Sequence, residues 1–203
     1  MIRTGIFGGT FNPPHRGHIY IAREAMKQAG LDRMIFLPCG NPYHKEQRDI
    51  ADAKHRYEMT RLAIKDEADF EICDIEVKSE NPGYTAVTLN RLKEIMHDEQ
   101  LCFLVGGDSL VDMEGWYHPS EIFDNAEVLV AKRGGMNGEL IDRTVSRYRR
   151  EYGAEIRVIE LSPVEISSSE IRERIRQDCG LADMLSPDVM EYIRKFNLYK
   201  DEK

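Results

Sequence analysis

Two glycines and two histidines near the start of the chain have the types and spacing that phosphate binding needs. Gly8 and Gly9 follow a short apolar run, and the segment after them has apolar residues at helical spacing that stops at Gly30. Backbone N–H groups at such a strand-to-helix turn can approach an anion, and the helix dipole favours negative charge there. His15 and His18 are three residues apart, which places both on one helix face. We therefore predict a phosphate site in which two imidazoles donate to phosphate oxygens and stabilise a charged transition state.

The same stretch also has simpler interpretations at this stage. A Gly-Gly turn after a strand is common, and a histidine pair at helical spacing is often exposed polar surface. The pair could instead bind a metal, although no third ligand lies nearby in the sequence, and we predict no protein-bound metal. Two other phosphate-binding patterns are absent from the sequence: G-x-G-x-x-G after a strand, and G-x-x-x-x-G-K-S/T.

A late segment offers a second set of groups that could bind an anion. Ser167 and Glu170 are three residues apart and fit a capping box, so one interpretation is a well-formed helix start. The same geometry would bring together the hydroxyls of Ser167 and Ser168, the free N–H groups of the helix start and the Arg172 guanidinium. Such a group of donors could bind a second part of a polyphosphate.

Two further segments could contact an anionic ligand. The proline-containing loop 41–45 carries His44 and Lys45 at a basic tip, although a single lysine in a loop is usually just solvated. Tyr84 and Thr85 precede a predicted helix, whose exposed N–H groups could bind a carboxylate or phosphate. The simpler interpretation of this second segment is a capped helix with Thr85 as its N-cap.

An aromatic pair lies in a predicted loop in the middle of the chain. Trp116 is the only tryptophan, and Tyr117 follows it directly. A tryptophan more often packs in the core than contacts a ligand. An aromatic pair in a loop beside a nucleotide site would nevertheless suit stacking on a flat heterocycle such as a pyridine ring.

Strands and helices alternate along the chain, and this alternation must position these groups. Alternating elements are typical of a parallel sheet with crossover helices. We predict a doubly wound α/β fold with a mainly parallel sheet and Rossmann-like topology. The predicted strands are Arg3–Phe7, Met34–Leu37, Phe70–Val77, Leu101–Val105, Val128–Ala131 and Ile156–Leu161. The predicted helices are His18–Ala29, Ala53–Ile64, Ala86–Met96, Leu140–Tyr152, Ser168–Gln177 and Pro187–Phe196.

The predicted topology brings two glycine turns to one crevice. In a doubly wound sheet, strands 1 and 4 are neighbours at the switch point, and ligands bind at their carboxyl ends. The fourth predicted strand leads into Gly106, Gly107 and Asp108. We therefore expect this turn to face the Gly8-Gly9 turn. Asp108 could accept hydrogen bonds from a ribose hydroxyl, or act as the N-cap of a following helix.

Length and composition restrict the class of protein. The 203 residues are enough for a single domain, 1–203, with a small C-terminal helical portion from about residue 167. A net charge of −8 argues against a general nucleic-acid surface. No run of about 18 apolar residues predicts a membrane span, and the immediate start of a core strand leaves no room for a signal peptide. Four scattered cysteines favour a reducing cytoplasm, and a homo-oligomer stays open.

Together these segments resemble the nicotinate-nucleotide adenylyltransferase family of the HxGH nucleotidyltransferase superfamily, nearly end to end. The superfamily pattern is Gly-Gly-Thr-Phe-Asn-Pro-Pro-His-Arg-Gly-His at Gly8–His18, with Ile166-Ser167-Ser168 and Ile171-Arg172 near the end. The segments Tyr84-Thr85 and Trp116-Tyr117 point to the pyridine nucleotide branch. The chain departs from the family at Asn12, where Asp is common, and at Val87, where an acidic residue is common.

The resemblance implies transfer of AMP from ATP to nicotinate mononucleotide, in NAD biosynthesis, by in-line attack of the acceptor phosphate on the α-phosphorus. Mg²⁺ would arrive on ATP. The implied catalytic groups are His15, His18, Lys45 and Arg172. ATP would be bound by Gly8, Gly9, Thr10, Phe11, His15, His18, Gly106, Asp108, Ser167, Ser168 and Arg172. Nicotinate mononucleotide would be bound by Asn12, His44, Lys45, Tyr84, Thr85, Trp116 and Tyr117.

Two other classes of function compete with this interpretation. A different transferase on the same scaffold, such as a phosphopantetheine adenylyltransferase or a glycerol-phosphate cytidylyltransferase, would keep both histidines but would not need Trp116 and Tyr117. A non-catalytic nucleotide sensor could keep the glycines and lose the charged groups. Because His15, His18, Lys45 and Arg172 are all present, catalysis is the favoured interpretation.

Overall fold

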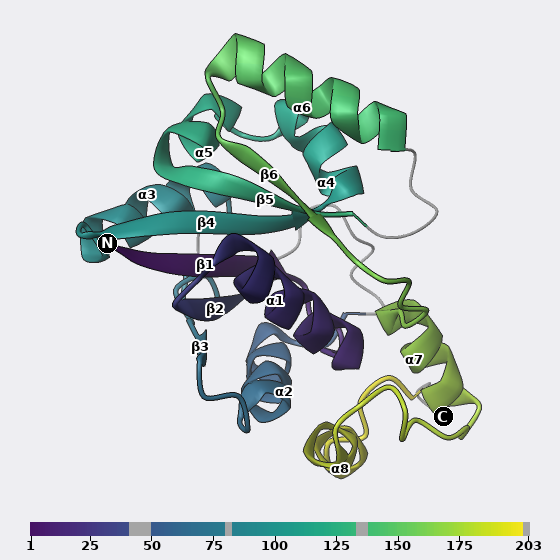
Figure 1. Cartoon of the computed structure of the whole chain (residues 1–203). Helices are drawn as coiled ribbons and strands as arrows, with labels where there is room; N and C mark the ends of the chain where they lie inside the picture. The colour runs from purple at the N-terminus through teal and green to yellow at the C-terminus, as the bar shows by residue number, and fades with distance from the viewer. Residues whose placement is uncertain (41–49, 80–82, 133–137, 201–203) are drawn as a thin grey trace.

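Six parallel strands form one sheet in the part of the chain that the computed structural model describes, which is residues 1–40, 50–79, 83–132 and 138–200. The strand order is β3-β2-β1-β4-β5-β6, so that β1 and β4 are central neighbours (Figure 1). This order confirms the predicted doubly wound topology and its switch point. The strands are β1 (Ile2–Gly9), β2 (Arg33–Pro38), β3 (Phe70–Ile72), β4 (Glu99–Gly106), β5 (Ala126–Lys132) and β6 (Ile156–Glu160).

All six predicted strands are present, and β3 is shorter than predicted. It pairs with β2 only from Phe70 to Ile72 and lies at the edge of the sheet. The N–H of Cys73 still donates to the carbonyl of Phe36, but the chain then turns, with the N–H of Lys78 donating to Asp74. The apolar run therefore predicted too long a strand, because β3 lies at the sheet edge and pairs with only one neighbouring strand.

The predicted long helices are also present, and α1 begins at Arg16, two residues before its predicted start. The helices are α1 (Arg16–Ala29), α2 (Ala53–Ile64), α3 (Thr85–Ile95), α4 (Gly107–Asp112), α5 (Pro119–Asn125), α6 (Gly138–Tyr152), α7 (Ser168–Arg176) and α8 (Pro187–Lys195), with a 3-10 turn η2 (Met113–Gly115). Helices α4 and α5 and the turn η2 were not predicted, because elements of this length show too few turns for a helical period.

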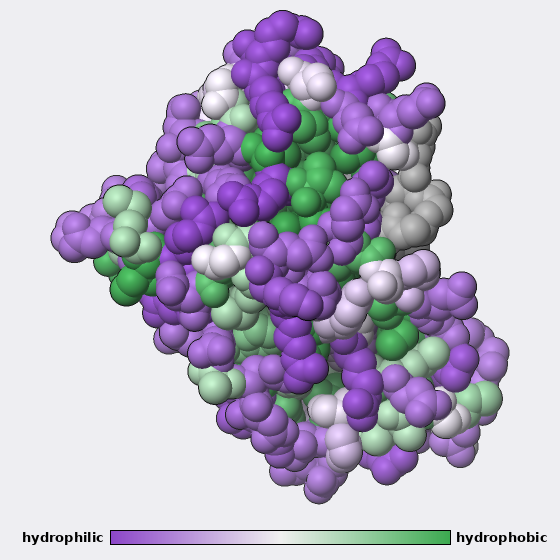
Figure 2. All heavy atoms as spheres, in the orientation of Figure 1, coloured by the Kyte–Doolittle hydropathy of each residue, from purple (hydrophilic) through white to green (hydrophobic). Residues whose placement is uncertain are grey.

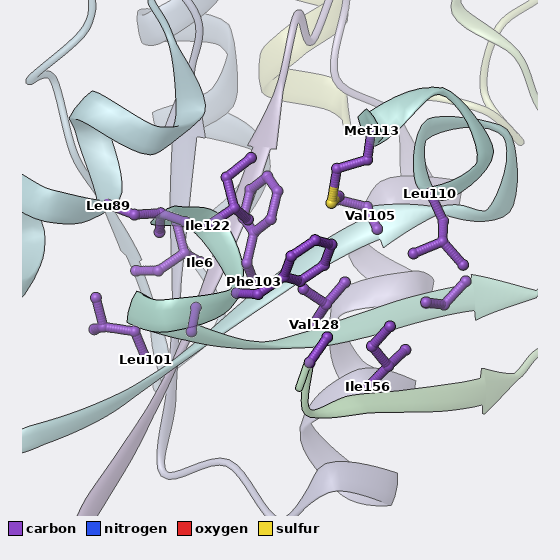
Figure 3. Close-up of a cluster of buried hydrophobic side chains, with 14 of the residues drawn as sticks. Ile6, Leu89, Leu101, Phe103, Val105, Leu110, Met113, Ile122, Val128 and Ile156 are labelled. Atoms are coloured by element: carbon purple, nitrogen blue, oxygen red, sulfur yellow. The ribbon is translucent and has the colours of Figure 1, made fainter. Parts of the chain in front are cut away.

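Helices cover both faces of the sheet. On one face, α3 to α6 pack over a cluster that includes Leu89, Leu110, Ile122 and Tyr148, and Phe103 lies near its centre (Figure 3). On the other face, α1 packs through residues such as Ala22 and, with α2, closes a second cluster. Each face buries large aliphatic and aromatic side chains, which is the main source of stability in such a fold. The two clusters hold the strand ends in place.

The C-terminal helices pack away from the sheet against α2. A third cluster joins Met59 of α2 to Ile171 and Ile175 of α7 and to Val189 and Ile193 of α8. Figure 1 shows α7 and α8 at the lower right, beyond the sheet and on the side of α2. This arrangement brings the start of α7 back toward the turn that follows β1.

The surface is mainly polar, as expected for a chain with a net charge of −8. On the face seen in Figure 2, hydrophilic side chains predominate and apolar side chains show in limited areas between them. A helix long and apolar enough to cross a bilayer does not occur among the described residues.

Candidate active site

A cavity of about 390 Å³ lies at the carboxyl ends of β1 and β4. Its walls include Gly8, Gly9 and Thr10 from the end of β1 and Gly106 from the end of β4. The two strands pair directly, with Phe7 opposite Leu104 in the register. The predicted crevice between two glycine turns is therefore present at the switch point of the sheet.

The wall opposite the glycines is aromatic and carries the predicted acceptor residues. Tyr84, Thr85, Trp116 and Tyr117 all line the cavity. The Tyr84 and Tyr117 rings stack with centroids 4.5 Å apart and an angle of 19° between their planes. Trp116 packs edge-on against Phe103, with centroids 6.5 Å apart, while part of its ring faces the cavity. Trp116 therefore packs in the core and also lines the cavity, while its role as a ligand platform stays a prediction.

Helix α3 begins at this wall. Its N-cap is Tyr84, and Thr85 is the first helical residue, so the interpretation of Thr85 as N-cap is wrong. The first N–H groups of a helix have no partner within the helix, and the dipole makes this end attractive to anions. The start of α3 thus presents N–H donors at the wall of the cavity.

The histidine pair lies at the start of α1. His15 is the N-cap, and its ring centroid is 3.7 Å from that of His18. The backbone N–H of His15 donates to Nδ1 of His18 over 3.1 Å, so the neutral His18 ring must carry its proton on Nε2. The network thereby assigns His18 as a donor at Nε2, which is the tautomer that a phosphate oxygen would need.

The N-terminus of α7 contacts the turn after β1 directly. The hydroxyl of Ser168 donates to the carbonyl of Pro13 over 2.9 Å, and Nη1 of Arg172 donates to the carbonyl of Asn12 over 2.9 Å. Ser167 is the N-cap of α7 and accepts from the N–H of Glu170, as the capping box predicted. The two predicted anion sites are therefore neighbours in space, although about 150 residues separate them in the chain.

Arg172 is placed to use more than one of its donors. Besides the contact to Asn12, its Nη2 lies 3.4 Å from the Ser169 hydroxyl. Its Nε is buried and has no hydrogen-bond partner among the described residues. A planar guanidinium with one donor fixed on the protein and another still to be satisfied suits a phosphate ligand.

The structure places the side chain of Asn12 in an internal network and not on the cavity wall. Its Oδ1 accepts from the N–H of Ala51 over 3.0 Å and from the hydroxyl of Tyr199 over 2.9 Å. Burial raises the pKa of Tyr199 well above its usual range, which keeps this hydroxyl protonated as a donor. Both contacts require only an acceptor, so Asn serves here as well as Asp would.

Of the residues predicted to bind ATP, Gly8, Gly9, Thr10 and Gly106 line the cavity; those that do not are Phe11, His15, His18, Asp108, Ser167, Ser168 and Arg172. Phe11 is buried, with φ at 48°, and its ring contacts the rings of Phe7 and His18. The Phe11 ring therefore packs against His18, one residue of the histidine pair. Asp108 is exposed in the first turn of α4, whose N-cap is Gly106, so the N-cap alternative for Asp108 is wrong. His44 and Lys45 lie outside the described residues.

Arg56 holds the turn after β1 from inside the protein. The side chain is 1% exposed and donates to the carbonyls of Thr10, Gly40 and Ala51 over 2.9, 2.6 and 2.9 Å. Burying a charged group is tolerated only when its donors are satisfied in this way. Arg56 is thus a structural cation that holds the turn after β1 in place.

Two residues that the sequence did not single out contribute to the site. Glu76 lines the cavity as a buried carboxyl, and Tyr199 supports Asn12 from the end of the chain. Glu76 lies inside the predicted strand Phe70–Val77 and Tyr199 beyond the last predicted helix, and neither position carried a signal that marked it as a site residue. Within the described part of the chain, no three His, Cys, Asp or Glu side chains come together as a metal site.

Comparison with known proteins agrees with this geometry. The chain matches the cytidylyltransferase-like family over residues 6–174. A Clostridium perfringens protein named probable nicotinate-nucleotide adenylyltransferase is 41% identical over 202 residues, covering 100% of both chains. A Carboxydothermus hydrogenoformans protein of the same name is 37% identical over 98% of each chain.

A solved structure shares the fold. Plasmodium falciparum nicotinic acid mononucleotide adenylyltransferase, complexed with NaAD, superposes with a TM-score of 0.78 over 98% of each chain at 20% identity. The fold, the switch-point cavity and the full-length relatives all agree. The chain therefore belongs to the cytidylyltransferase-like family and, within it, to the nicotinate-nucleotide adenylyltransferases.

Proposed function

We propose that this protein transfers AMP from ATP to nicotinate mononucleotide, forming nicotinate adenine dinucleotide and pyrophosphate in NAD biosynthesis. The observation that carries the proposal is a single cavity with the glycine turns of β1 and β4 on one side and an aromatic wall with a helix start on the other. The full-length relatives bear the name of this enzyme. One end of the cavity suits phosphates, and the other suits a flat ring with a negative substituent.

In the proposed reaction, an oxygen of the acceptor 5′-phosphate attacks the α-phosphorus of ATP. A new P–O bond forms as the bond from the α-phosphorus to the bridging oxygen breaks, and pyrophosphate leaves with that electron pair. The attacking phosphate is already an anion, and so no general base or covalent intermediate is needed. Catalysis then consists of positioning and of stabilising charge on the transferring group.

Charge stabilisation is assigned to donors around the turn after β1. His18 donates from Nε2, the position that its contact with His15 leaves protonated. Arg172 reaches the same turn from α7 and has its buried Nε available. The hydroxyl of Thr10 lies at the cavity edge, whereas that of Ser168, at the start of α7, donates to the carbonyl of Pro13 and would have to rotate to donate to a phosphate. Each of these donors would gain strength as negative charge develops.

His15 and Lys45 complete the phosphate site in the proposal. His15 packs against His18 and orients it through its backbone N–H. Lys45 belongs to a loop outside the described residues, and its role rests on the sequence alone. Mg²⁺ enters with the triphosphate as part of the substrate, and no side chain is assigned to it.

Selection of the acceptor is assigned to the aromatic wall. Trp116 would stack on the pyridine ring, and N–H groups near Thr85 and Tyr117 would bind its carboxylate. A carboxamide would leave its own NH₂ donor facing these donors, which disfavours the amide substrate. Nucleic acid and membranes have no part in this reaction. All four cysteines are free thiols, as is usual in a reducing compartment, and the proposal places the enzyme in the cytoplasm.

The test is a comparison of acceptors. The protein is incubated with ATP and either nicotinate mononucleotide, nicotinamide mononucleotide or phosphopantetheine, and with CTP and glycerol phosphate, while pyrophosphate release is measured. Release with nicotinate mononucleotide, and weaker release with its amide, is expected. Release only with phosphopantetheine or glycerol phosphate would replace the proposed acceptor. Nucleotide binding without pyrophosphate release in any mixture would indicate a sensor.

A further inference from the structure

Glu76 is a buried carboxyl that the proposed reaction does not use. It lies in the turn after β3, is 8% exposed and lines the cavity beside Tyr84 and Thr85. The hydroxyl of Thr88, one turn into α3, donates to its Oε1 over 2.8 Å. Removing a carboxyl from water is costly unless hydrogen bonds replace the lost hydration. Its position beside the acceptor wall therefore calls for a specific role.

Glu76 joins the start of α3 to the end of β2. A Cβ atom placed on Gly83, just before α3, would lie 2.6 Å from Oε2 of Glu76, so a larger residue there would displace the end of the Glu76 side chain. On its other side, Gly40, two residues after β2, packs closely against the backbone of Glu76, because a Cβ atom placed on Gly40 would overlap the Glu76 carbonyl oxygen. Glu76 thus contacts two segments that arrive from different strands.

These contacts continue to the phosphate side of the cavity. The guanidinium of Arg56 donates to the carbonyl of Gly40 and also to that of Thr10 in the turn after β1. Thr88 is therefore joined to Glu76 by a hydrogen bond, Glu76 packs against Gly40, and hydrogen bonds from Arg56 join Gly40 to Thr10. The two ends of the cavity are connected by this chain of contacts inside the protein.

Burial and the groups around Glu76 shift the pKa of its carboxyl in opposite directions. Burial raises its pKa above the usual range, while the hydrogen bond from Thr88, the nearby backbone of Gly40 and the charge of Arg56 act to lower it. A carboxylate can accept hydrogen bonds at both oxygens, whereas an amide of the same size accepts at only one end. Glutamine at this position would therefore place an NH₂ donor where glutamate can only accept.

We propose that Glu76 is a positioning residue for acceptor recognition, which holds the start of α3 at the distance from the glycine turns that lets its N–H groups bind the substrate carboxylate. The inference rests on the proposed function, because it concerns the acceptor carboxylate. A binding site displaced by about 1 Å can lose on the order of a hundredfold in rate. Glu76 acts through Thr88 and Gly83 and need not touch the reacting atoms.

The test measures acceptor binding separately from turnover. Trp116, the only tryptophan, lies on the cavity wall, so its fluorescence can report binding of nicotinate mononucleotide in the absence of ATP. In Glu76→Gln and in Thr88→Val, we expect the dissociation constant for this ligand to rise about tenfold, the effect of losing one charge-assisted hydrogen bond. The KM for ATP should stay within about twofold of the wild-type value.

Conservative variants and a matched control distinguish a positioning role of Glu76 and Thr88 from a general effect on the stability of the protein. Thr88→Ser keeps the hydroxyl and should restore affinity for nicotinate mononucleotide. The double variant of Glu76 and Thr88 should lose no more than about the larger single effect, because both remove one contact. Glu127→Gln removes a buried carboxylate near the amino ends of β4 and β5, where it pairs with Arg3, and should leave this affinity unchanged.

The outcomes distinguish this inference from the proposed function. Wild-type protein that neither binds nicotinate mononucleotide nor converts it would refute the proposed function. Wild-type binding together with unchanged or tighter binding by Glu76→Gln would overturn the positioning role, as would an equal loss for both substrates. If Glu76→Gln fails to fold, the comparison of Thr88→Val with Thr88→Ser decides, and equal affinities in these two variants would also overturn it.

Discussion

Replacing Arg172 by lysine tests the assignment of α7 to the phosphate site. The guanidinium has Nη1 fixed on the carbonyl of Asn12 at 2.9 Å and a buried Nε with no partner among the described residues. Lysine keeps the positive charge. Its ammonium, however, lacks the planar fork of N–H donors with which arginine can bind the Asn12 carbonyl and a phosphate at the same time. The substitution therefore removes geometry while it retains charge.

The expected loss follows from the number of contacts involved. One hydrogen bond from a charged donor contributes about 1.5 to 3 kcal/mol, and each 1.4 kcal/mol changes a rate about tenfold. If the phosphate contact of Arg172 forms mainly in the transition state, Arg172→Lys should lower kcat by about 10- to 100-fold. Steady-state pyrophosphate release with saturating substrates measures this value. The KM for ATP should change less than kcat.

Arg174, on the same helix, provides the matched control. It pairs with Glu170 over 2.8 Å at the surface, and such exposed pairs contribute about 0.3 to 0.5 kcal/mol. Arg174→Lys should therefore leave kcat within about twofold of the wild-type value. Equal kcat values for wild-type protein and Arg172→Lys, or equal losses in the two variants, would refute the assignment of Arg172 to the phosphates.

Three further substitutions test other parts of the account. Trp116→Ala should raise the KM for nicotinate mononucleotide about tenfold or more and leave the KM for ATP unchanged, because base stacking on an aromatic ring contributes about 1 to 3 kcal/mol. Equal effects on both KM values would show that Trp116 has only a structural role. Tyr199→Phe removes the donor to Asn12 and should lower the free energy of unfolding by about 1 kcal/mol in denaturant titrations, and an unchanged midpoint would contradict the role of this contact. Burial alone would raise the pKa of Glu127, but Arg3 and other partners bring it below the ordinary value of 4.5, so ionised Glu127 stabilises the fold above that pH. The stability difference between Glu127→Gln and wild-type protein should therefore shrink as the pH falls below 4.5, and a difference independent of pH would contradict this.

The sheet and the long helices could be predicted because their apolar residues repeat with a clear period. Helix α2 has the predicted bounds, Ala53–Ile64, and α1 ends before Gly30 as expected. Helix α4 has only six residues, Gly107–Asp112, and offers no repeat to read. The strand β3 ends early because it lies at the edge of the sheet. The apolar run at 70–77 does not show which strand will occupy the edge.

The location of the site could also be predicted, since it follows from topology. Neighbouring parallel strands end at one edge, so the turns at Gly8 and Gly106 had to meet. The direction of individual side chains could not be predicted: Asn12 belongs to a signature whose positions were predicted to bind ligands, yet its side chain bonds within the protein. The contact between Asn12 and Tyr199 joins residues 187 positions apart, and only the folded chain reveals it.

The most direct test of AMP transfer at this cavity is a single turnover with ATP labelled at the α-phosphorus. The enzyme, in excess over ATP, is mixed with nicotinate mononucleotide and the label is followed in wild-type protein and in His18→Ala. We expect the label to pass into nicotinate adenine dinucleotide in wild-type protein and the variant to transfer it at least about tenfold more slowly. Label that stays in ATP or appears only in AMP, or equal rates in the two proteins, would contradict this expectation.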